Sequence, residues 1–125
     1  MGRWRILVVE DEPDIREILV NLLSEVAEVE SAVDGLDALE RLQRGPAPSV
    51  ILLDLRMPRL SGVELLGVLA RSPTHPPVVT MSANADTGPP GAAAHLQKPF
   101  ALSGLVAALY RASFPAPAPG CAGMV

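Results

Sequence analysis

The sequence has one cysteine, no excess of positive charge and no long apolar run, and each lack argues against a class of protein. Cys121 has no partner for an internal disulfide, which fits a reducing compartment at least as well as an oxidising one. The net charge of -4 offers no cluster of Lys and Arg for nucleic acid or an anionic membrane. Nothing approaches the roughly 20 apolar residues of a membrane span or the core of a signal peptide. We therefore expect a soluble, cytoplasmic protein without direct contact to nucleic acid or membrane.

The length and composition predict one domain followed by a short tail. A chain of 125 residues with 49% hydrophobic residues is long enough to bury a core without covalent staples. From Pro115 onward Pro alternates with Ala and Gly, and such a composition cannot bury a core. We therefore predict a domain over residues 1–114 and a disordered tail over residues 115–125.

Short apolar runs rich in β-branched residues alternate with segments of helical periodicity. Buried parallel strands are predicted at residues 6–9, 50–53 and 78–81, with weaker strands at 29–33 and 94–97. Helices are predicted from Pro13 to about residue 25, over 35–44, after a capping box at Ser61 and Glu64, and over 101–113. This alternation predicts a doubly wound α/β sheet.

Three acidic residues fall at the carboxyl ends of the predicted central strands. Glu10 and Asp11 follow the first strand, and Asp54 ends the third. In a parallel sheet these ends meet at one edge, where ligands bind. Three carboxylates there repel one another unless a cation lies among them, and Mg²⁺ prefers such oxygen ligands. The charges therefore predict a magnesium site.

Ser82 ends the fourth strand and Lys98 follows the fifth, which adds a hydroxyl and an ammonium group to the same edge. A carboxylate nucleophile, a metal, a cation and a hydroxyl donor together suit phosphoryl transfer. Taken singly, Asp54 could be a turn residue, Ser82 a strand-end hydroxyl and Lys98 a solvated charge. Their combination favours the functional interpretation.

Four motifs lie in order at the ends of four predicted strands. They are Val8-Val9-Glu10-Asp11-Glu12-Pro13, Leu53-Asp54-Leu55-Arg56-Met57-Pro58 with Ser61-Gly62-Val63-Glu64-Leu65, Ser82-Ala83, and Lys98-Pro99-Phe100. Together they resemble the receiver domain of bacterial two-component response regulators over roughly residues 5 to 113. The resemblance implies a flavodoxin-like, five-stranded parallel sheet in the order 2-1-3-4-5 and a switch that is not a turnover enzyme.

The resemblance also implies roles for individual residues. Asp54 would accept a phosphoryl group from a sensor histidine kinase, a phosphotransfer protein or a small acyl-phosphate donor. Mg²⁺ would be held by Asp11 directly, by Glu10 directly or through water, by Asp54, and by the backbone carbonyl of Arg56. Ser82 would swing toward the phosphoryl group and Lys98 would pair with it, while Lys98–Pro99 would be a cis peptide.

Two features depart from the family pattern. Residues 83–93 are too few for the family's fourth helix and contain Gly88-Pro89-Pro90-Gly91, so we expect that helix to be absent, reduced to a turn or disordered. His95 stands where the family usually has Tyr or Phe as the switch residue. Both features place the output of the switch in question more than its chemistry.

Other functions remain open at the sequence level. A magnesium phosphatase with an aspartyl-phosphate intermediate usually has a second acid two residues after the nucleophile, where this chain has Arg56. A degenerate receiver that acts as a phosphorylation-independent interaction module is the main alternative. The downstream partner, a homodimer and an effector domain beyond Val125 are likewise left open.

Overall fold

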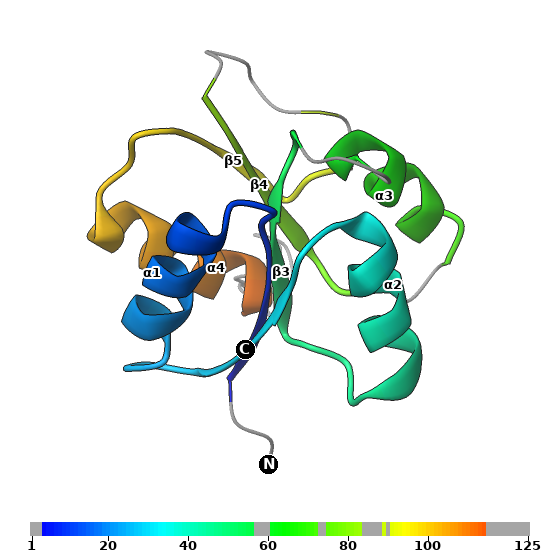
Figure 1. Cartoon of the computed structure of the whole chain (residues 1–125), viewed down its shortest axis with the longest axis horizontal. Coiled ribbons are helices and arrows are strands. Elements are labelled where there is room, and N and C mark those ends of the chain that lie inside the picture. The colour runs from blue at the N-terminus through cyan, green and yellow to red at the C-terminus, as the bar shows by residue number, and fades with distance from the viewer. Residues whose placement is uncertain (1–3, 57–60, 73–74, 84–88, 90, 115–125) are drawn as a thin grey trace, which may run out of the picture.

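The apolar runs predicted as strands pair in one parallel sheet (Figure 1). The structure is a computed structural model that describes residues 4–56, 61–72, 75–83, 89 and 91–114. The strand order is β2-β1-β3-β4-β5, which confirms the predicted flavodoxin-like fold. The strands are β1 (Arg5–Val9), β2 (Glu28–Ala32), β3 (Val50–Asp54), β4 (Val78–Ser82) and β5 (Ala94–Gln97).

Four described helices cover the two faces of this sheet. They are α1 (Pro13–Leu23), α2 (Gly35–Arg44), α3 (Gly62–Leu69) and α4 (Leu102–Ser113). Figure 1 shows α1 and α4 on one side of the sheet and α2 and α3 on the other. Each face has its own apolar cluster, and each fully buried Leu, Ile or Val side chain contributes about 1.5–3 kcal/mol. Every residue of β3 and β4 is buried, which gives the site a rigid base.

Several element boundaries differ by one or two residues from the sequence prediction, and those of α1, β2 and α4 are described in turn. Helix α1 ends at Leu23, because Ser24 caps it by donating its hydroxyl to the carbonyl of Val20 at 2.6 Å. Strand β2 is shifted one residue toward the N-terminus because its ladder with β1 runs to Ala32, and the next amide, Val33 N, donates to Asp37 Oδ2 instead. Helix α4 begins at Leu102 with Ala101 as its N-cap residue.

The segment between β4 and β5 contains no helix among its described residues, 83, 89 and 91–93. Gly91 has a φ of 92°, which favours glycine, and Ala92 N donates to the carbonyl of Pro89 in a turn. This agrees with the predicted loss of a regular helix. The predicted disorder of part of this segment, and the predicted tail over residues 115–125, fall outside the described residues.

An aromatic cluster covers the start of β1, far from the strands' carboxyl ends. The rings of Trp4 and Tyr110 meet edge to face at 5.8 Å, and Phe114 lies 5.0 Å from Tyr110. Trp4 Nε1 donates to Ser113 Oγ at 2.9 Å.

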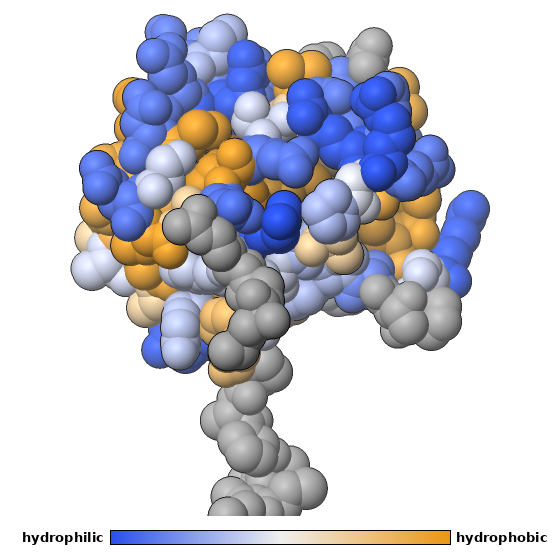
Figure 2. All heavy atoms as spheres, turned by 90° about the horizontal axis from the view of Figure 1, so that it is seen from below, coloured by the Kyte–Doolittle hydropathy of each residue, from blue (hydrophilic) through white to orange (hydrophobic). Residues whose placement is uncertain are grey.

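Figure 2 views the molecule from below and shows apolar patches between hydrophilic side chains. None of the described helices is long and apolar enough to cross a membrane.

Candidate functional site

The residues expected to form the site meet at the carboxyl edge of the sheet. Glu10 follows β1 directly, and the β1–β3 register pairs Val9 with Leu53, so that Glu10 lies beside Asp54. Both carboxylates are nearly inaccessible, with exposed fractions of 1% for Glu10 and 5% for Asp54. The apolar strands thus hold two acidic groups against the edge of the core.

Glu10, Asp11 and Asp54 form the acidic cluster predicted from the sequence. One carboxylate oxygen from each of the three lies within 4.8 Å of the others. Lys98 Nζ lies 3.2 Å from Glu10 Oε1 and 3.6 Å from Asp54 Oδ2. One ammonium group therefore pairs with two of the three carboxyl groups, and the three acidic groups outnumber the single cation that contacts them among the described residues.

The pKa of Glu10 is raised from 4.5 to about 7. Burial is the largest cause, followed by the hydrogen bond with Asp54 and the charge of Asp54. The backbone amide of Glu12 and the ammonium of Lys98 oppose the rise without cancelling it. Glu10 therefore holds its proton until the pH approaches about 7.

A divalent cation with a preference for oxygen fits this donor set. Three convergent carboxylates with one neighbouring ammonium group leave charge that Mg²⁺ would balance. The backbone of Arg56 is close to the cluster, since its amide donates to Asp54 Oδ1 at 3.1 Å. Glu10, Asp11, Asp54 and the Arg56 carbonyl are the groups that would hold the ion. When bound, Mg²⁺ would neutralise these carboxylates and polarise the oxygens of an incoming phosphoryl group.

The loop after β1 is fixed by its own polar contacts. Arg16 of α1 donates through Nη1 to the carbonyls of Glu10 at 2.9 Å and Asp11 at 3.3 Å. The amide of Glu12 donates to Glu10 Oε2 at 3.2 Å. Helix α1 therefore holds the acidic loop in place at its N-terminal end.

On the other face of the sheet from α1, the first turn of α3 packs against the backbone of Asp54 and Leu55 (Figure 1). Ser61 and Glu64 form the predicted capping box, with both side-chain-to-backbone bonds present. Gly62, the first residue of α3, is so close that a Cβ there would lie 2.6 Å from the Asp54 carbonyl oxygen and 2.6 Å from Leu55 Cα. This contact was not predicted from the sequence, although a glycine at the start of a helix was the available signal.

Ser82 and His95 also lie where the sequence placed them. Ser82 is buried at the end of β4, and its carbonyl accepts from the Lys98 amide at 2.7 Å. His95 Nε2 lies 3.5 Å from Ser82 Oγ. The Lys98–Pro99 peptide bond is cis, as the resemblance implied. Thr80, which contacts His95, was not predicted as a site residue; its only signal in the sequence was a hydroxyl within an apolar strand.

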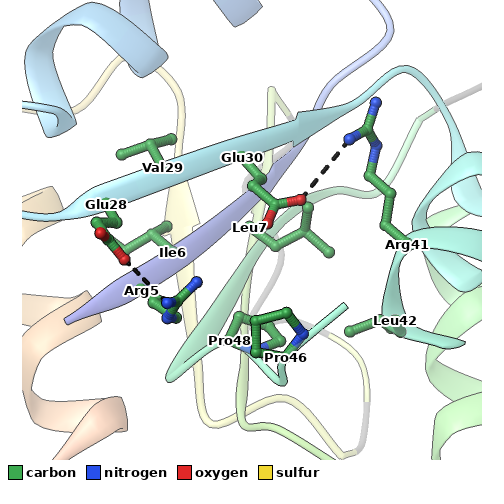
Figure 3. A pocket seen from close by; sticks show the side chains of 10 residues that line it. All are labelled: Arg5, Ile6, Leu7, Glu28, Val29, Glu30, Arg41, Leu42, Pro46 and Pro48. Carbon is green, nitrogen blue, oxygen red and sulfur yellow. Dashed lines mark ion pairs between the residues drawn. The ribbon is translucent and has the colours of Figure 1, made fainter. Parts of the chain in front are cut away.

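A separate hollow of about 230 Å³ lies near the start of β1 and β2 (Figure 3). Two ion pairs line it, Arg5 Nη2 to Glu28 Oε2 at 3.3 Å and Arg41 Nη1 to Glu30 Oε2 at 3.7 Å. Since these charges balance in pairs, the hollow has no excess charge with which to select an ionic ligand. The chemistry concentrates at the acidic cluster.

The raised pKa of Glu10 predicts an unusual pH dependence of stability. Because the folded state binds this proton more tightly than the unfolded state, the associated stabilisation is present at low pH and is lost as the pH rises through about 7. Without metal, the wild type should lose more thermal stability between pH 5.5 and pH 8 than Glu10→Gln, measured by circular dichroism. Equal losses would contradict the prediction.

Comparisons with known proteins give the class of protein that this fold and site define. The model of the response regulator receiver domain family matches residues 6–110. The chain therefore belongs to the response regulator receiver domain family.

Two curated relatives and one solved structure illustrate the similarity. The transcriptional regulatory protein BtsR of Escherichia coli (strain K12) is 38% identical over 81 residues, which cover 60% of this chain and 31% of BtsR. KdpE of Mycobacterium tuberculosis (strain CDC 1551 / Oshkosh), also a transcriptional regulatory protein, is 35% identical over 111 residues, covering 83% of this chain and 48% of KdpE. The chain thus spans about a third to a half of the length of these relatives.

The solved structure is that of the response regulator TrrA from Thermotoga maritima in complex with Mg²⁺-BeF. It superposes with a TM-score of 0.77 at 30% sequence identity, covering 86% of this chain and 97% of TrrA's. The similarity extends across nearly the whole receiver domain.

Proposed function

We propose that this receiver domain is a phosphoacceptor switch in two-component signal transduction, with Asp54 as the acceptor. The observation that carries the proposal is the placement of Asp54, nearly buried, within reach of two other carboxylates and the ammonium of Lys98. This arrangement supplies a fixed nucleophile beside groups that balance the charge of a phosphoryl group.

The residues perform distinct parts of the transfer. A carboxylate oxygen of Asp54 attacks the phosphorus of a phosphohistidine on a sensor histidine kinase or phosphotransfer protein. An oxygen–phosphorus bond forms as the phosphorus–nitrogen bond breaks, and the donor's imidazole leaves with the electron pair. A carboxylate attacks without first losing a proton, so this transfer requires no general base. Lys98 and the Ser82 hydroxyl stabilise the charge of the transferred group.

An apolar groove beside the acidic site supports a protein as donor. The groove, of about 330 Å³, lies between α1 and α4 and is bordered by Lys98 and Pro99. Ile18 and Leu22 of α1 line it with exposed fractions of 57% and 42%. A helix of a donor protein that packs into this groove would lie next to the phosphoryl acceptor.

The cytoplasmic location and the downstream partner stay predictions.

One observation favours the alternative of a phosphorylation-independent interaction module. The described residues between β4 and β5 form no helix, where the resemblance to the family implies one. Both functions require protein contacts, but only the switch requires a working acceptor.

Binding of beryllofluoride, a phosphoryl mimic, separates the two functions. With Mg²⁺ present, the wild type should bind beryllofluoride at least about 100-fold more tightly than Asp54→Asn, because the mimic needs a carboxylate oxygen as its ligand. Isothermal titration calorimetry with and without Mg²⁺ measures this difference. A wild type that binds no better than Asp54→Asn would leave the interaction module as the better explanation.

A further inference from the structure

Three polar side chains form a connected chain beside the acidic cluster. The β4–β5 register pairs Thr80 with His95, which places their side chains on the same face of the sheet. Thr80 Oγ1 lies 2.7 Å from His95 Nδ1, and His95 Nε2 lies 3.5 Å from Ser82 Oγ. The imidazole ring therefore bridges two hydroxyls, one fully buried and one at the edge that carries Asp54.

The hydrogen bonds along Thr80, His95 and Ser82 must run in one direction, because each hydroxyl and a neutral imidazole have one polar hydrogen to donate. Either the donors point toward the carboxyl edge or they point away from it. The Thr80 hydroxyl can also donate to the Ala94 carbonyl, but that distance is 3.4 Å against 2.7 Å to His95. The shorter contact favours donation from Thr80 to Nδ1, which places the ring hydrogen on Nε2, facing Ser82.

The negative charge of the acidic cluster favours the same direction of donation, from Thr80 toward Ser82. The acidic cluster, and a phosphoryl group on Asp54, attract the hydrogen of a nearby hydroxyl. When Nε2–H donates to Ser82 Oγ, the Ser82 hydroxyl accepts from the ring and can donate its own hydrogen to a phosphoryl oxygen. Successive donors in one direction also polarise one another.

We propose that His95 is a positioning residue that orients the Ser82 hydroxyl toward the phosphoryl group, with Thr80 fixing the tautomer of its ring. The hydrogen bonds run from Thr80 to Nδ1, from Nε2 to Ser82, and from Ser82 to a phosphoryl oxygen. No proton is transferred between these groups. The inference rests on the proposed function and assigns the control of Ser82 to a hydrogen-bonded relay.

A double-mutant cycle tests the relay. In the wild type with Mg²⁺, His95→Phe should weaken beryllofluoride binding about 5-fold, since it removes one hydrogen-bond donor to Ser82. In a Ser82→Ala background the same substitution should have no further effect, because its target is gone. A role of His95 in packing alone would instead cost the same factor in both backgrounds.

Two further variants keep the test decisive. Thr80→Val, which preserves the buried shape, should weaken binding about 2-fold and only when His95 is present. His95→Gln, which retains a donor and an acceptor, should recover part of the affinity. Thermal melts establish that each variant folds, and if His95→Phe does not, the cycle is run with Thr80→Val.

The outcomes distinguish this inference from the proposed function. Additive losses across the cycle, or no loss in His95→Phe, overturn the relay while wild-type binding upholds the acceptor site. A wild type that binds no better than Asp54→Asn overturns the proposed function and the relay with it.

Discussion

Asp54→Asn is expected to abolish the incorporation of a phosphoryl group from a small phosphodonor. Asn keeps the size and the hydrogen bond from the Arg56 amide to Oδ1, but its amide is a far weaker nucleophile than a carboxylate. The wild type, incubated with Mg²⁺ and acetyl phosphate, should gain the mass of one phosphoryl group. The variant should gain less than about one hundredth of that label under the same conditions.

Two variants serve as controls for this experiment. Asp37→Asn removes a carboxylate of α2 that is not part of the acidic cluster, and this variant should be labelled like the wild type. Asp11→Asn retains the acceptor but removes one carboxylate of the cluster, so its labelling should be slow and should respond weakly to Mg²⁺. Peptide mapping that locates the label on a residue other than Asp54 would contradict the assignment.

The second large effect is expected from Gly62→Ala. The added methyl group would lie 2.6 Å from the Asp54 carbonyl oxygen and from Leu55 Cα, and backbone atoms cannot rotate away as a side chain can. We expect a loss of about 3 kcal/mol in the free energy of unfolding, measured by urea denaturation. Labelling should fall as well, because relief of the overlap displaces the backbone that carries Asp54.

Gly67→Ala is the matched control in the same helix. Gly67 is exposed, and a Cβ there meets nothing within 4 Å. The change from Gly to Ala inside a helix should therefore stabilise the protein by about 0.5–1 kcal/mol. Opposite signs for the two substitutions would identify the close approach of α3 as the cause. Equal effects would mean that helix propensity alone explains both.

Much of the fold could be predicted because its signals are local. Apolar runs such as those around Leu52 and Val79 define buried strands, and their polar ends define the edge where ligands bind. The acidic cluster followed from this rule, since Glu10 and Asp54 end adjacent strands.

The remaining features depend on contacts between distant segments. The hydrogen-bonded ion pair of Lys98 and Glu10 joins residues 88 positions apart. No local sequence pattern shows that Glu10 is the carboxylate nearest to Lys98. Gly62 and Thr80 were missed for the same reason: a glycine or a threonine acquires its role from the atom placed opposite by folding. Residues with charged or reactive side chains could therefore be predicted from the sequence, whereas residues whose role depends on their neighbours in the fold could not.

The aromatic cluster around Trp4 gives the molecule a built-in optical reporter. Trp4 is the only tryptophan, and β1 separates it from Glu10 by six positions, about 20 Å of extended strand. Its emission should therefore follow unfolding of the domain without direct quenching by an ion at the acidic cluster. Any change in Trp4 emission when beryllofluoride binds would measure how far the domain transmits the state of Asp54.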